Sequence, residues 1–387
     1  MKYRKFGKLN WKASALGFGA MRLPTVGGDA AKIDEPEATE MLRYAIDHGV
    51  NYVDTAYPYH GGSSFRGGSS ETFLAKALQD GYKDKVKIAT KMPTWLVASQ
   101  KDMDKYLNQQ LDKLQAGTID FYLLHGLGRE RWQKLQKLNV TGWLERKVDE
   151  GKIGHLGFSF HDEFQAFKEI IDSYDGWTLC QMQYNYMDAD YQAGTKGLEY
   201  ASSKGLAVVV MEPIAGGRLA INPPQEVQEL WNTAKAKRSQ AEWALRWVWN
   251  HPEVSVVLSG MSTLQQVREN VETADHSERP TLSSQELSLI SKVAEKYREL
   301  GFAACTGCRY CQPCPQGVAI PEIVELYNQY YAEDRNPQIK TKYKNTIAQE
   351  NRAKNCIRCG KCEEICPQKL PIRQILGNAA FILEQGA

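Results

Sequence analysis

The sequence predicts an α/β protein in which a (β/α)8 TIM barrel is followed by a smaller cysteine-rich domain. Eight short apolar runs alternate with amphipathic segments between Leu16 and about Thr273, as in a parallel sheet with crossover helices. Runs such as LAVVVM suit strands that are buried on both faces. Eight such pairs in about 260 residues match the typical size of this barrel, about 250 residues. Of the nine cysteines, eight lie between Cys305 and Cys366. We therefore expect a barrel over residues 1–280 and a second domain over residues 281–387.

The expected elements follow in order. Before the first barrel strand, residues 3–19 predict a β-hairpin at the floor of the barrel. In the first helix, Asp34 can cap the N-terminus, Pro36 fits the first turn and Gly49 ends it. A doubly wound open sheet is the alternative fold, but its GxGxxG turn is missing after the first strand. The expected strands begin at Ala15, Val50, Val86, Ile119, Ile153, Thr178, Leu206 and Glu253.

Composition narrows the class of protein. The 387 residues carry 48 Lys and Arg against 46 Asp and Glu, a net charge of +2 that gives no electrostatic reason to bind nucleic acid. No run approaches the roughly 20 apolar residues of a membrane helix, and the N-terminus lacks the apolar segment of a signal peptide. We expect a cytoplasmic protein with neither nucleic-acid nor membrane partners.

Four polar side chains stand at or after the ends of predicted strands, where barrels of this kind carry their catalytic groups. They are Asp54, Tyr59, Lys91 and His125. Any one of them alone would be read more readily as a solvated rim residue. Together they make a coherent catalytic set: if the reaction is the reduction of a carbonyl by hydride, the alkoxide that it leaves must be protonated.

The chemistry gives each group a role. A phenol with a pKa near about 10 is a poor acid unless a cation stabilises its phenolate, and Lys91 supplies that cation for Tyr59. Asp54 would hold Lys91 charged, and His125 would donate a hydrogen bond to the substrate oxygen. Run in reverse, Tyr59 is the base in alcohol oxidation. Tyr57 is its nearest competitor.

The segments DTAYPYHGG, IATKM, FYLLH, QMQYN and GMSTLQQVREN, in this order, resemble the aldo-keto reductase superfamily. The resemblance implies a barrel that binds NADPH or NADH in an extended pose and interconverts an aldehyde, ketone or sugar carbonyl with an alcohol. It places Asp54, Tyr59, Lys91 and His125 in a catalytic tetrad. It favours Tyr59 over Tyr57, because Tyr59 stands five residues after Asp54.

The loops after the seventh and eighth strands are expected to hold the cofactor's phosphates. In the first of them, Gly216 and Gly217 allow close backbone approach and Arg218 can pair with a phosphate. The resemblance adds contacts to the nicotinamide and adenine. The expected cofactor contacts are Gly19, Met21, Ser159, Gln181, Met211, Glu212, Pro213, Gly216, Arg218, Ser259, Gly260, Ser262, Gln266, Glu269 and Asn270.

The chain departs from the family pattern in several places. Gly260 and Gln266 stand where the resemblance places the Lys and Arg for the 2′-phosphate, so NADH and NADPH both stay open, although Arg268 or Ser262 could reach that group. Met211 replaces a ring-stacking Tyr, and Phe160 replaces an Asn. Residues 61–70 (GGSSFRGGSS) form an insertion that could cover the active site or loop out, of which looping out is favoured.

The tail carries two cysteine motifs, CTGCRYCQPCP and CIRCGKCEEICP. The second has the spacing of two-cluster bacterial ferredoxins, and the first differs only in the spacing before its fourth cysteine. Zinc is the alternative, but zinc ribbons need no three cysteines at successive intervals of three followed by Cys-Pro. The motifs predict a ferredoxin-like domain with two [4Fe–4S] clusters. The ferredoxin rule assigns Cys305, Cys308, Cys311 and Cys366 to cluster 1, and Cys356, Cys359, Cys362 and Cys314 to cluster 2.

The rest of the tail and the remaining cysteine are expected to be structural. A helix from Pro321 should pack its apolar face on the barrel or the clusters, and Cys180 should be an inert core thiol. The leading function is therefore a nicotinamide-dependent oxidoreductase of the iron–sulfur branch of the family. Nicotinamide moves two electrons, a cluster moves one, and no flavin motif is present, so the clusters are either structural or serve a one-electron partner. The alternative is an electron carrier or redox-responsive scaffold in which the clusters carry the function.

Overall fold

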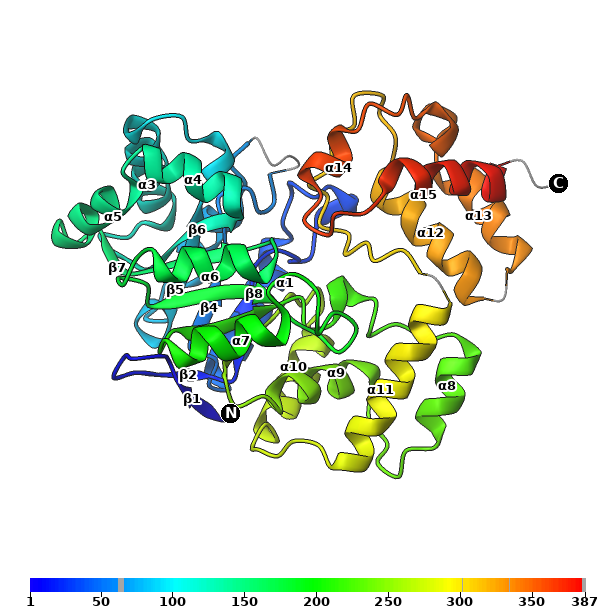
Figure 1. Cartoon of the computed structure of the whole chain (residues 1–387), viewed down its shortest axis with the longest axis horizontal. Helices are drawn as coiled ribbons and strands as arrows, with labels where there is room; N and C mark the ends of the chain where they lie inside the picture. The colour runs from blue at the N-terminus through cyan, green and yellow to red at the C-terminus, as the bar shows by residue number, and fades with distance from the viewer. Residues whose placement is uncertain (62–65, 301, 334, 385–387) are drawn as a thin grey trace. The chain divides into compact units, whose positions relative to one another are not determined.

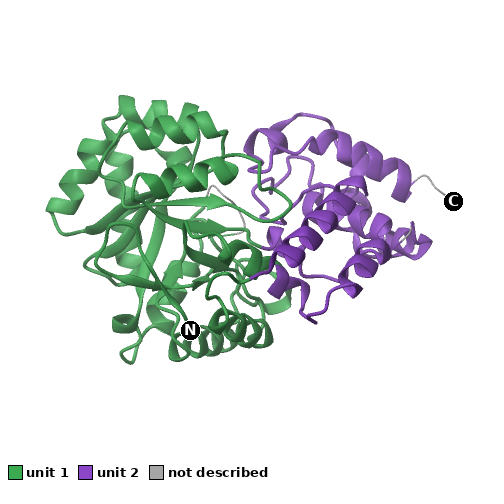
Figure 2. Ribbon diagram, turned by 60° about the horizontal axis from the view of Figure 1, so that its bottom comes forward, with its two compact units in different colours: residues 1–213, 244–281 green, residues 214–243, 282–387 purple. Residues whose placement is uncertain are grey.

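The computed structural model describes residues 1–61, 66–300, 302–333 and 335–384 (Figure 1). The chain forms two compact units (Figure 2). Unit 1 comprises Met1–Pro213 and Ala244–Thr281, and unit 2 comprises Ile214–Trp243 and Leu282–Ala387. Residues 214–243, which the sequence analysis placed in the first domain, are grouped with unit 2 by their packing.

Unit 1 is a closed barrel of eight parallel strands in the order β10-β3-β4-β5-β6-β7-β8-β9, as the sequence predicts. An antiparallel hairpin, β1 with β2, precedes it. The strands are β1 (Tyr3–Lys5), β2 (Lys12–Ser14), β3 (Leu16–Gly19), β4 (Tyr52–Asp54), β5 (Lys87–Met92), β6 (Ile119–Leu127), β7 (Ile153–Phe160), β8 (Leu179–Gln183), β9 (Ala207–Met211) and β10 (Val254–Ser259).

Helices surround the strands of unit 1 (Figure 1). The first begins where the sequence predicts, because the side chain of Asp34 accepts a hydrogen bond from the Glu37 amide. The α-helices of the barrel region are α1 (Glu35–Asp47), α2 (Ser70–Ala77), α3 (Gln100–Leu114), α4 (Arg129–Lys137), α5 (Val140–Asp149), α6 (Phe164–Asp172), α7 (Gly194–Ser203), α9 (Gln240–Trp249) and α10 (Leu264–Asp275). Short 3-10 helices lie at Val26–Gly28, Lys83–Lys85, Thr94–Leu96 and Ala215–Gly217.

The hairpin closes the floor of the barrel with aromatic side chains. Phe6 is fully buried, and its ring lies 4.9 Å from that of Phe121 and 5.7 Å from that of Tyr52, both in the barrel interior. Gly7 lets the chain make this approach, since a Cβ there would lie 2.6 Å from the Ala207 nitrogen, and its φ is +54°. The interior is therefore a packed core.

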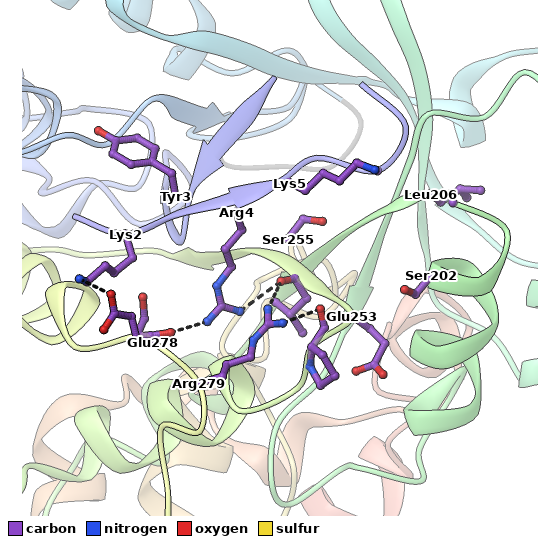
Figure 3. Close-up of a pocket in the computed structure, with 15 residues that line it drawn as sticks. Lys2, Tyr3, Arg4, Lys5, Ser202, Leu206, Glu253, Ser255, Glu278 and Arg279 are labelled. Atoms are coloured by element: carbon purple, nitrogen blue, oxygen red, sulfur yellow. Dashed lines mark hydrogen bonds and ion pairs between the residues drawn. The ribbon is translucent and has the colours of Figure 1, made fainter. Parts of the chain in front are cut away.

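A hollow of about 580 Å³ lies at the amino-terminal end of the barrel, between the hairpin and β10 (Figure 3). Arg4 and Arg279 line it, and both guanidinium groups donate hydrogen bonds to the carbonyls of Trp249 and Val254. Burial, together with the charge of Arg279, lowers the pKa of Arg4 to about 9. The two arginines thus tie the end of α9 to the start of β10.

Unit 2 is helical and has its own core. Its α-helices are α8 (Gln225–Asn232), α11 (Ser284–Glu299), α12 (Ile320–Ala332), α13 (Pro337–Thr346), α14 (Lys361–Ile365) and α15 (Ile372–Ala379). Short 3-10 helices lie at Gln349–Asn351 and Ala353–Asn355, and a π-helix lies at Ala380–Glu384. The face of α12 with Ile323, Val324 and Tyr327 is buried in this core, beside partly buried cysteines of both motifs. This burial agrees with the packing expected for that helix. Within unit 2, α8 packs on α11, and Arg238 bonds Glu286 at 2.5 Å.

In the part of the chain that the structure describes, the helices lack the length and apolar character needed to span a lipid bilayer.

Candidate active site and cluster ligands

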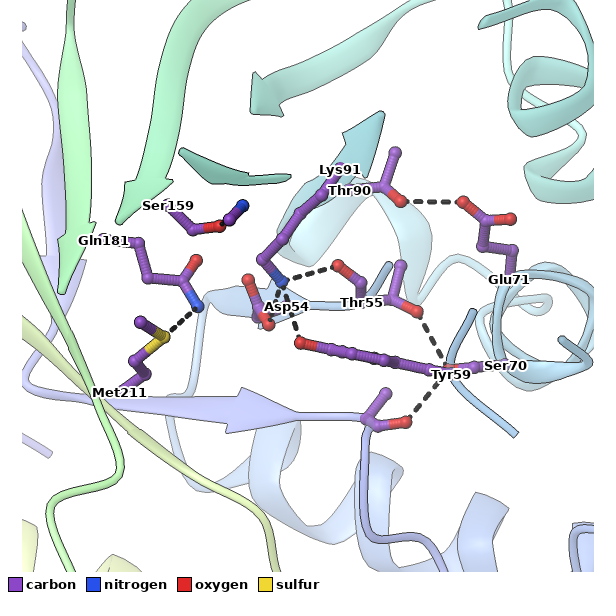
Figure 4. A network of polar contacts seen from close by, with 12 residues as sticks. Asp54, Thr55, Tyr59, Ser70, Glu71, Thr90, Lys91, Ser159, Gln181 and Met211 are labelled. Carbon is purple, nitrogen blue, oxygen red and sulfur yellow. Dashed lines mark hydrogen bonds and ion pairs between the residues drawn. The ribbon is translucent and has the colours of Figure 1, made fainter. Parts of the chain in front are cut away.

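Three neighbouring parallel strands bring the predicted catalytic residues together, and Figure 4 shows Asp54, Tyr59 and Lys91 of this group. Asp54 ends β4, Lys91 lies near the end of β5, and His125 lies near the end of β6. Because β4 pairs with β5 and β5 with β6, these side chains come from adjacent positions around one end of the barrel. Tyr59 follows in the loop after β4 and is 8% exposed.

The ammonium of Lys91 links Asp54 to Tyr59. Its Nζ lies 2.6 Å from Asp54 Oδ1 and 3.3 Å from Tyr59 Oη, and it also donates to the Thr55 carbonyl at 2.8 Å. Lys91 is fully buried and Asp54 is 2% exposed. The structure therefore sets a single cation between a carboxylate and a phenol in a site that excludes water.

Burial sets the electrostatics of this ion pair. It raises the pKa of the Asp54 carboxyl, and the charge of Lys91 opposes that rise. It lowers the pKa of the Lys91 ammonium, and the charge of Asp54 opposes that fall. Each group thus offsets part of the cost of desolvating the other.

His125 is held neutral. Burial, and then the charge of Lys91, keep its pKa well below the ordinary value of 6.5. A neutral imidazole carries one N–H donor. The side chain of Thr94 donates to the His125 carbonyl at 2.5 Å, and the ring of Trp95 packs edge-on at 5.1 Å, so two neighbours fix this residue.

Tyr57 lies in different surroundings from Tyr59. Its ring packs edge-on against Tyr106 at 5.1 Å, and the ammonium of Lys113 lies 5.0 Å from its centre. Burial, followed by the charge of Glu71, raises its pKa. The hydrogen bond from Lys91 goes to the hydroxyl of Tyr59.

A buried polar network around Glu71, which sequence reasoning missed, contacts the backbone of Lys91. Glu71 accepts hydrogen bonds from Thr90 at 2.7 Å and from Gln110 at 2.6 Å, and Gln110 also donates to the Lys91 carbonyl at 3.1 Å. Burial raises the pKa of Glu71, and these hydrogen bonds oppose the rise. The signal in the sequence is weak, since Glu71 stands directly after residues 61–70 with no motif of its own. Within the insertion, residues 62–65 lie outside the described residues, so looping out stays a prediction.

The expected nicotinamide contacts lie on β7, β8 and β9. Ser159 accepts a hydrogen bond from the Gly126 amide at 2.7 Å, and Gln181 Nε2 lies 3.7 Å from the sulfur of Met211. The Oε1 atom of Gln181 is buried and has no hydrogen-bond partner among the described residues. A buried acceptor without a donor fits a bound group that carries N–H donors, such as a carboxamide.

The expected adenine-end contacts gather after β10. Asn270 donates to Ser259 at 3.0 Å, and Gln266 accepts from the Ser262 amide at 2.8 Å. Gly260 packs against Arg22, whose carbonyl accepts a hydrogen bond from Ser262 at 2.8 Å. Three other expected contacts have surroundings of their own. Gly19 lies close to the Ser259 carbonyl, Met21 is half-buried, and Glu269 accepts a hydrogen bond from Gln265 at 2.7 Å.

The expected phosphate loop is divided between the units. Met211, Glu212 and Pro213 belong to unit 1, whereas Gly216 and Arg218 belong to unit 2. In unit 2, Arg218 donates to the Ala303 carbonyl at 2.9 Å, and a Cβ at Gly216 would collide with Thr306. The part of this loop in unit 2 therefore packs on the segment that begins the first cysteine motif.

Thiols of both cysteine motifs influence one another's pKa. Burial, and then the charges of Cys308, Cys305, Cys366 and Cys362, raise the pKa of Cys311. Burial, Glu363 and then Cys356 raise the pKa of Cys362 to about 11. Within the described ranges, no three His, Cys, Asp or Glu side chains converge on one point that would hold a single ion. In a cubane cluster each cysteine bonds a different iron, so such convergence is not needed. Cys180 belongs to unit 1 and is fully buried in β8.

Comparison with known proteins accounts for both units. The sequence profile of the Aldo/keto reductase family matches residues 15–295. The chain belongs to the aldo/keto reductase family. A second profile, for a 4Fe-4S dicluster domain, matches residues 304–370 of this aldo/keto reductase. Both matches confirm the resemblances drawn from the sequence.

Relatives of this aldo/keto reductase cover its barrel. L-galactose dehydrogenase of Arabidopsis thaliana is 27% identical over 78% of this chain and 96% of its own. The 6-dehydroglucose reductase of Novosphingobium aromaticivorans is 25% identical over 70% of this chain and 89% of its own. Among solved structures, the holo form of an aldo-keto reductase from Bacillus halodurans has a TM-score of 0.62 at 27% identity, covering 76% of this chain and 96% of its own. The protein is thus an oxidoreductase with a C-terminal 4Fe-4S domain.

Proposed function

We propose that this aldo/keto reductase interconverts an aldehyde, ketone or sugar carbonyl and an alcohol by hydride transfer, with NADPH or NADH as cofactor and Tyr59 as the acid and base. The observation that carries the proposal is the position of Lys91 Nζ, 2.6 Å from Asp54 and 3.3 Å from the Tyr59 hydroxyl, inside a buried site. A phenol placed beside a cation can release its proton at a pH where an isolated phenol would not.

In this proposal, the nicotinamide supplies the hydride when it is bound. The hydroxyl of Tyr59 gives its proton to the substrate oxygen as negative charge develops there. Lys91 stabilises the phenolate that this transfer leaves, and Asp54 keeps Lys91 charged. His125, neutral because its pKa is held low, donates a hydrogen bond to the same oxygen. In the oxidation of an alcohol, Tyr59 takes the proton instead.

Side chains of the barrel would hold the cofactor. Gln181 Oε1, which is buried without a partner in the described part of the chain, and Ser159 would accept and donate hydrogen bonds to the carboxamide. Met211 would lie against the nicotinamide ring, while Glu269 and Asn270 would meet the adenine. The other proposed contacts are Gly19, Met21, Glu212, Pro213, Gly216, Arg218, Ser259, Gly260, Ser262 and Gln266.

We further propose that the dicluster domain binds two [4Fe–4S] clusters and exchanges single electrons with a partner. Cluster 1 would take Cys305, Cys308, Cys311 and Cys366, the set that the ferredoxin rule assigns. Cluster 2 would take Cys356, Cys359, Cys362 and Cys314. Two cubanes require about eight iron and eight sulfide atoms, which an anaerobic analysis of the purified protein would count.

A sugar is the substrate class that the relatives favour. L-galactose dehydrogenase and 6-dehydroglucose reductase both carry the names of sugars that they act on. A screen of aldoses, their oxidised forms and simple aldehydes, with each nicotinamide, would rank these substrates by kcat/KM.

Paired tyrosine variants test the catalytic role. We expect Tyr59→Phe to lower kcat for carbonyl reduction by about 10³-fold while cofactor binding stays unchanged, because only the proton donor is removed. Tyr57→Phe is the matched control and should keep kcat within about threefold. The reverse result, with Tyr57→Phe inactive and Tyr59→Phe active, would move the acid to Tyr57.

A further inference from the structure

We propose that the loop Cys356–Lys361 is the docking surface for an acidic protein that carries one electron, and that electrons cross there between this carrier and cluster 2. The inference rests on the proposed cluster ligands and goes beyond them by assigning the entry point and the charge of the partner. We call residues 356–361 the docking loop.

Exposure singles out this loop. Of the eight cysteines in the two motifs, Cys359 is the exposed one, while the other seven are half-buried or buried. Ile357 and Arg358 beside it are exposed as well, Ile357 to 60%. An electron crosses most readily where a cluster ligand comes to the protein surface, because the transfer distance is shortest there. Within unit 2, that ligand is Cys359.

The charge around the loop favours an acidic partner. Residues 352–373, which hold the second motif, carry six Lys and Arg against two Glu, and one of these acids, Glu363, is already paired with Arg373 at 2.6 Å. Residues 305–322, which hold the first motif, carry one Arg and one Glu, and these two are bonded to each other. The excess of positive charge therefore lies in the segment of the second motif, which holds three of the four proposed ligands of cluster 2. Opposite charge on a carrier would steer its encounter with this surface.

Backbone conformation shows that arginine is not the residue best suited to position 358. The residues on either side of the second cysteine are left-handed in both motifs: Gly307 and Arg309 in the first, with φ of +62° and +63°, and Arg358 and Gly360 in the second, with φ of +58° and +80°. At the position before that cysteine, the first motif has Gly307, and glycine is the residue best suited to a positive φ. The second motif has Arg358 there. The second motif thus keeps an exposed cation where glycine would fit the backbone more easily.

The loop also offers a small apolar contact. Ile357 is exposed between Cys356 and Arg358, so its side chain can be covered by a partner that the surrounding cations attract. An apolar centre with a charged rim is the usual composition of a protein–protein interface. In the transfer itself, the carrier loses one electron and cluster 2 gains one, with no bond made or broken and no proton required.

Stopped-flow mixing tests the proposal on the protein with its clusters loaded. The probe is a reduced flavodoxin chosen for its net negative charge, and the readout is the loss of cluster absorbance under anaerobic conditions. We expect the second-order rate constant to fall steeply as salt is raised. The double variant Arg358→Glu with Lys361→Glu should lower this constant at least 10-fold at low salt, without changing the iron content.

Two further variants separate docking from folding. Arg358→Gly copies the first motif, so it relieves the backbone while removing the charge, and we expect it to slow the reaction about threefold. The control is Lys235→Glu with Lys237→Glu, an equal change of charge on exposed lysines elsewhere in unit 2, which should stay within twofold. An equal loss in the control pair, or an unchanged rate in Arg358→Gly and the double variant, would overturn the proposal.

The remaining outcomes assign a failure to its source. If dithionite cannot reduce the loaded clusters, the proposed one-electron role fails and the docking surface fails with it. If dithionite reduces them but a basic carrier reacts as fast as the acidic flavodoxin, only the docking surface fails. Sedimentation with phosphatidylserine vesicles that depends on Arg358 and Lys361, combined with a rate for flavodoxin that does not, would overturn it in favour of a lipid surface.

Discussion

Lys91 and Asp54 form an ion pair that is sealed from solvent, with Nζ 2.6 Å from Oδ1 and side-chain exposures of 1% and 3%. The second carboxylate oxygen of Asp54 is buried without a hydrogen-bond partner among the described residues. A buried ion pair with an unmet acceptor contributes little net stability, because desolvation offsets the attraction. The pair is therefore better explained by what the charge of Lys91 does for Tyr59 than by folding.

Asp54→Asn should separate these two effects. Without the carboxylate, the ammonium of Lys91 loses the charge that opposes its desolvation, so its pKa falls further and the cation is lost at lower pH. We expect kcat for reduction at pH 7 to drop about 10²-fold, and the alkaline limb of the pH profile to move to lower pH. We also expect the free energy of unfolding to fall by about 3 kcal/mol. Rate profiles against pH and denaturant unfolding measure the two.

Asp120→Asn is the matched control for that variant. Asp120 pairs with Lys87 at 2.8 Å between the same two strands as Lys91 and His125, but the side chains are 31% and 37% exposed. Such a pair is worth about 1 kcal/mol or less, so stability should change little and the pH profile should not move. An equal shift of the profile in both variants would contradict the role given to Asp54.

Arg22 is expected to favour NADPH over NADH. Its side chain packs on Gly260, where a Cβ would lie 3.2 Å from Arg22 Cδ. Arg22 therefore lies beside the position at which the family pattern has a lysine. We expect Arg22→Met to weaken NADPH binding about 10-fold and NADH binding less than twofold, since a charge-assisted bond to the 2′-phosphate is worth about 1.5 kcal/mol or more. Fluorescence titration of both cofactors measures this. The comparison is Arg268→Met, which removes a guanidinium that lies over the ring of Tyr44. If Arg268→Met weakens NADPH binding more than Arg22→Met does, the role belongs to Arg268.

The barrel, and the grouping of Asp54, Lys91 and Tyr59 at one end of it, could be predicted because their signals are local. A parallel strand buried on both faces must be a nearly continuous apolar run, so a polar residue at its end, such as Asp54 or Lys91, stands out in the sequence. The cysteine motifs were visible for the same reason, since cluster ligands fall at fixed short spacings.

What sequence reasoning missed depends on residues that are distant in the chain. Glu71 takes its meaning from Thr90 and Gln110, which lie on β5 and α3, so nothing next to Glu71 marks it as part of a network. The sequence pattern places residues 214–243 in the barrel domain. In the structure α8 of this segment packs on α11, which begins more than forty residues later, and no local pattern marks that contact. An amphipathic pattern predicts that a helix has a buried face, but not which unit covers it.

His251 should make the stability of unit 1 depend on pH. Burial, and then the charge of Arg279, lower its pKa from 6.5 to about 4. Between those two values the unfolded chain binds a proton that the folded chain does not, so the free energy of unfolding falls as pH drops from 6.5 to 4 and levels off below. His251→Gln should flatten this dependence in urea unfolding measured across that range. The exposed His276→Gln should leave the slope unchanged, and equal slopes in all three proteins would exclude this role of His251.

Removal of iron should destabilise unit 2 and spare unit 1. The partly buried cysteines Cys305, Cys311, Cys314, Cys356 and Cys362 pack against the core of unit 2, which shares no residue with the cores of the barrel. Without the clusters these thiols lose the bonds that hold their segments, and burial of the free thiol groups gives little in return. Calorimetry of the chelated protein should therefore lose the transition of unit 2 and keep that of unit 1 within about 2 °C.

Cys180→Ala should have the opposite effect to iron removal, lowering the stability of unit 1 and not that of unit 2. Cys180 is fully buried in β8, so its truncation should lower only the transition of unit 1, by about 1 kcal/mol, and leave the iron content unchanged. If chelation lowered both transitions equally while Cys180→Ala lowered both as well, the two units would unfold as one. In that case the clusters would stabilise the barrel too, and the hydride chemistry would depend on them for its fold.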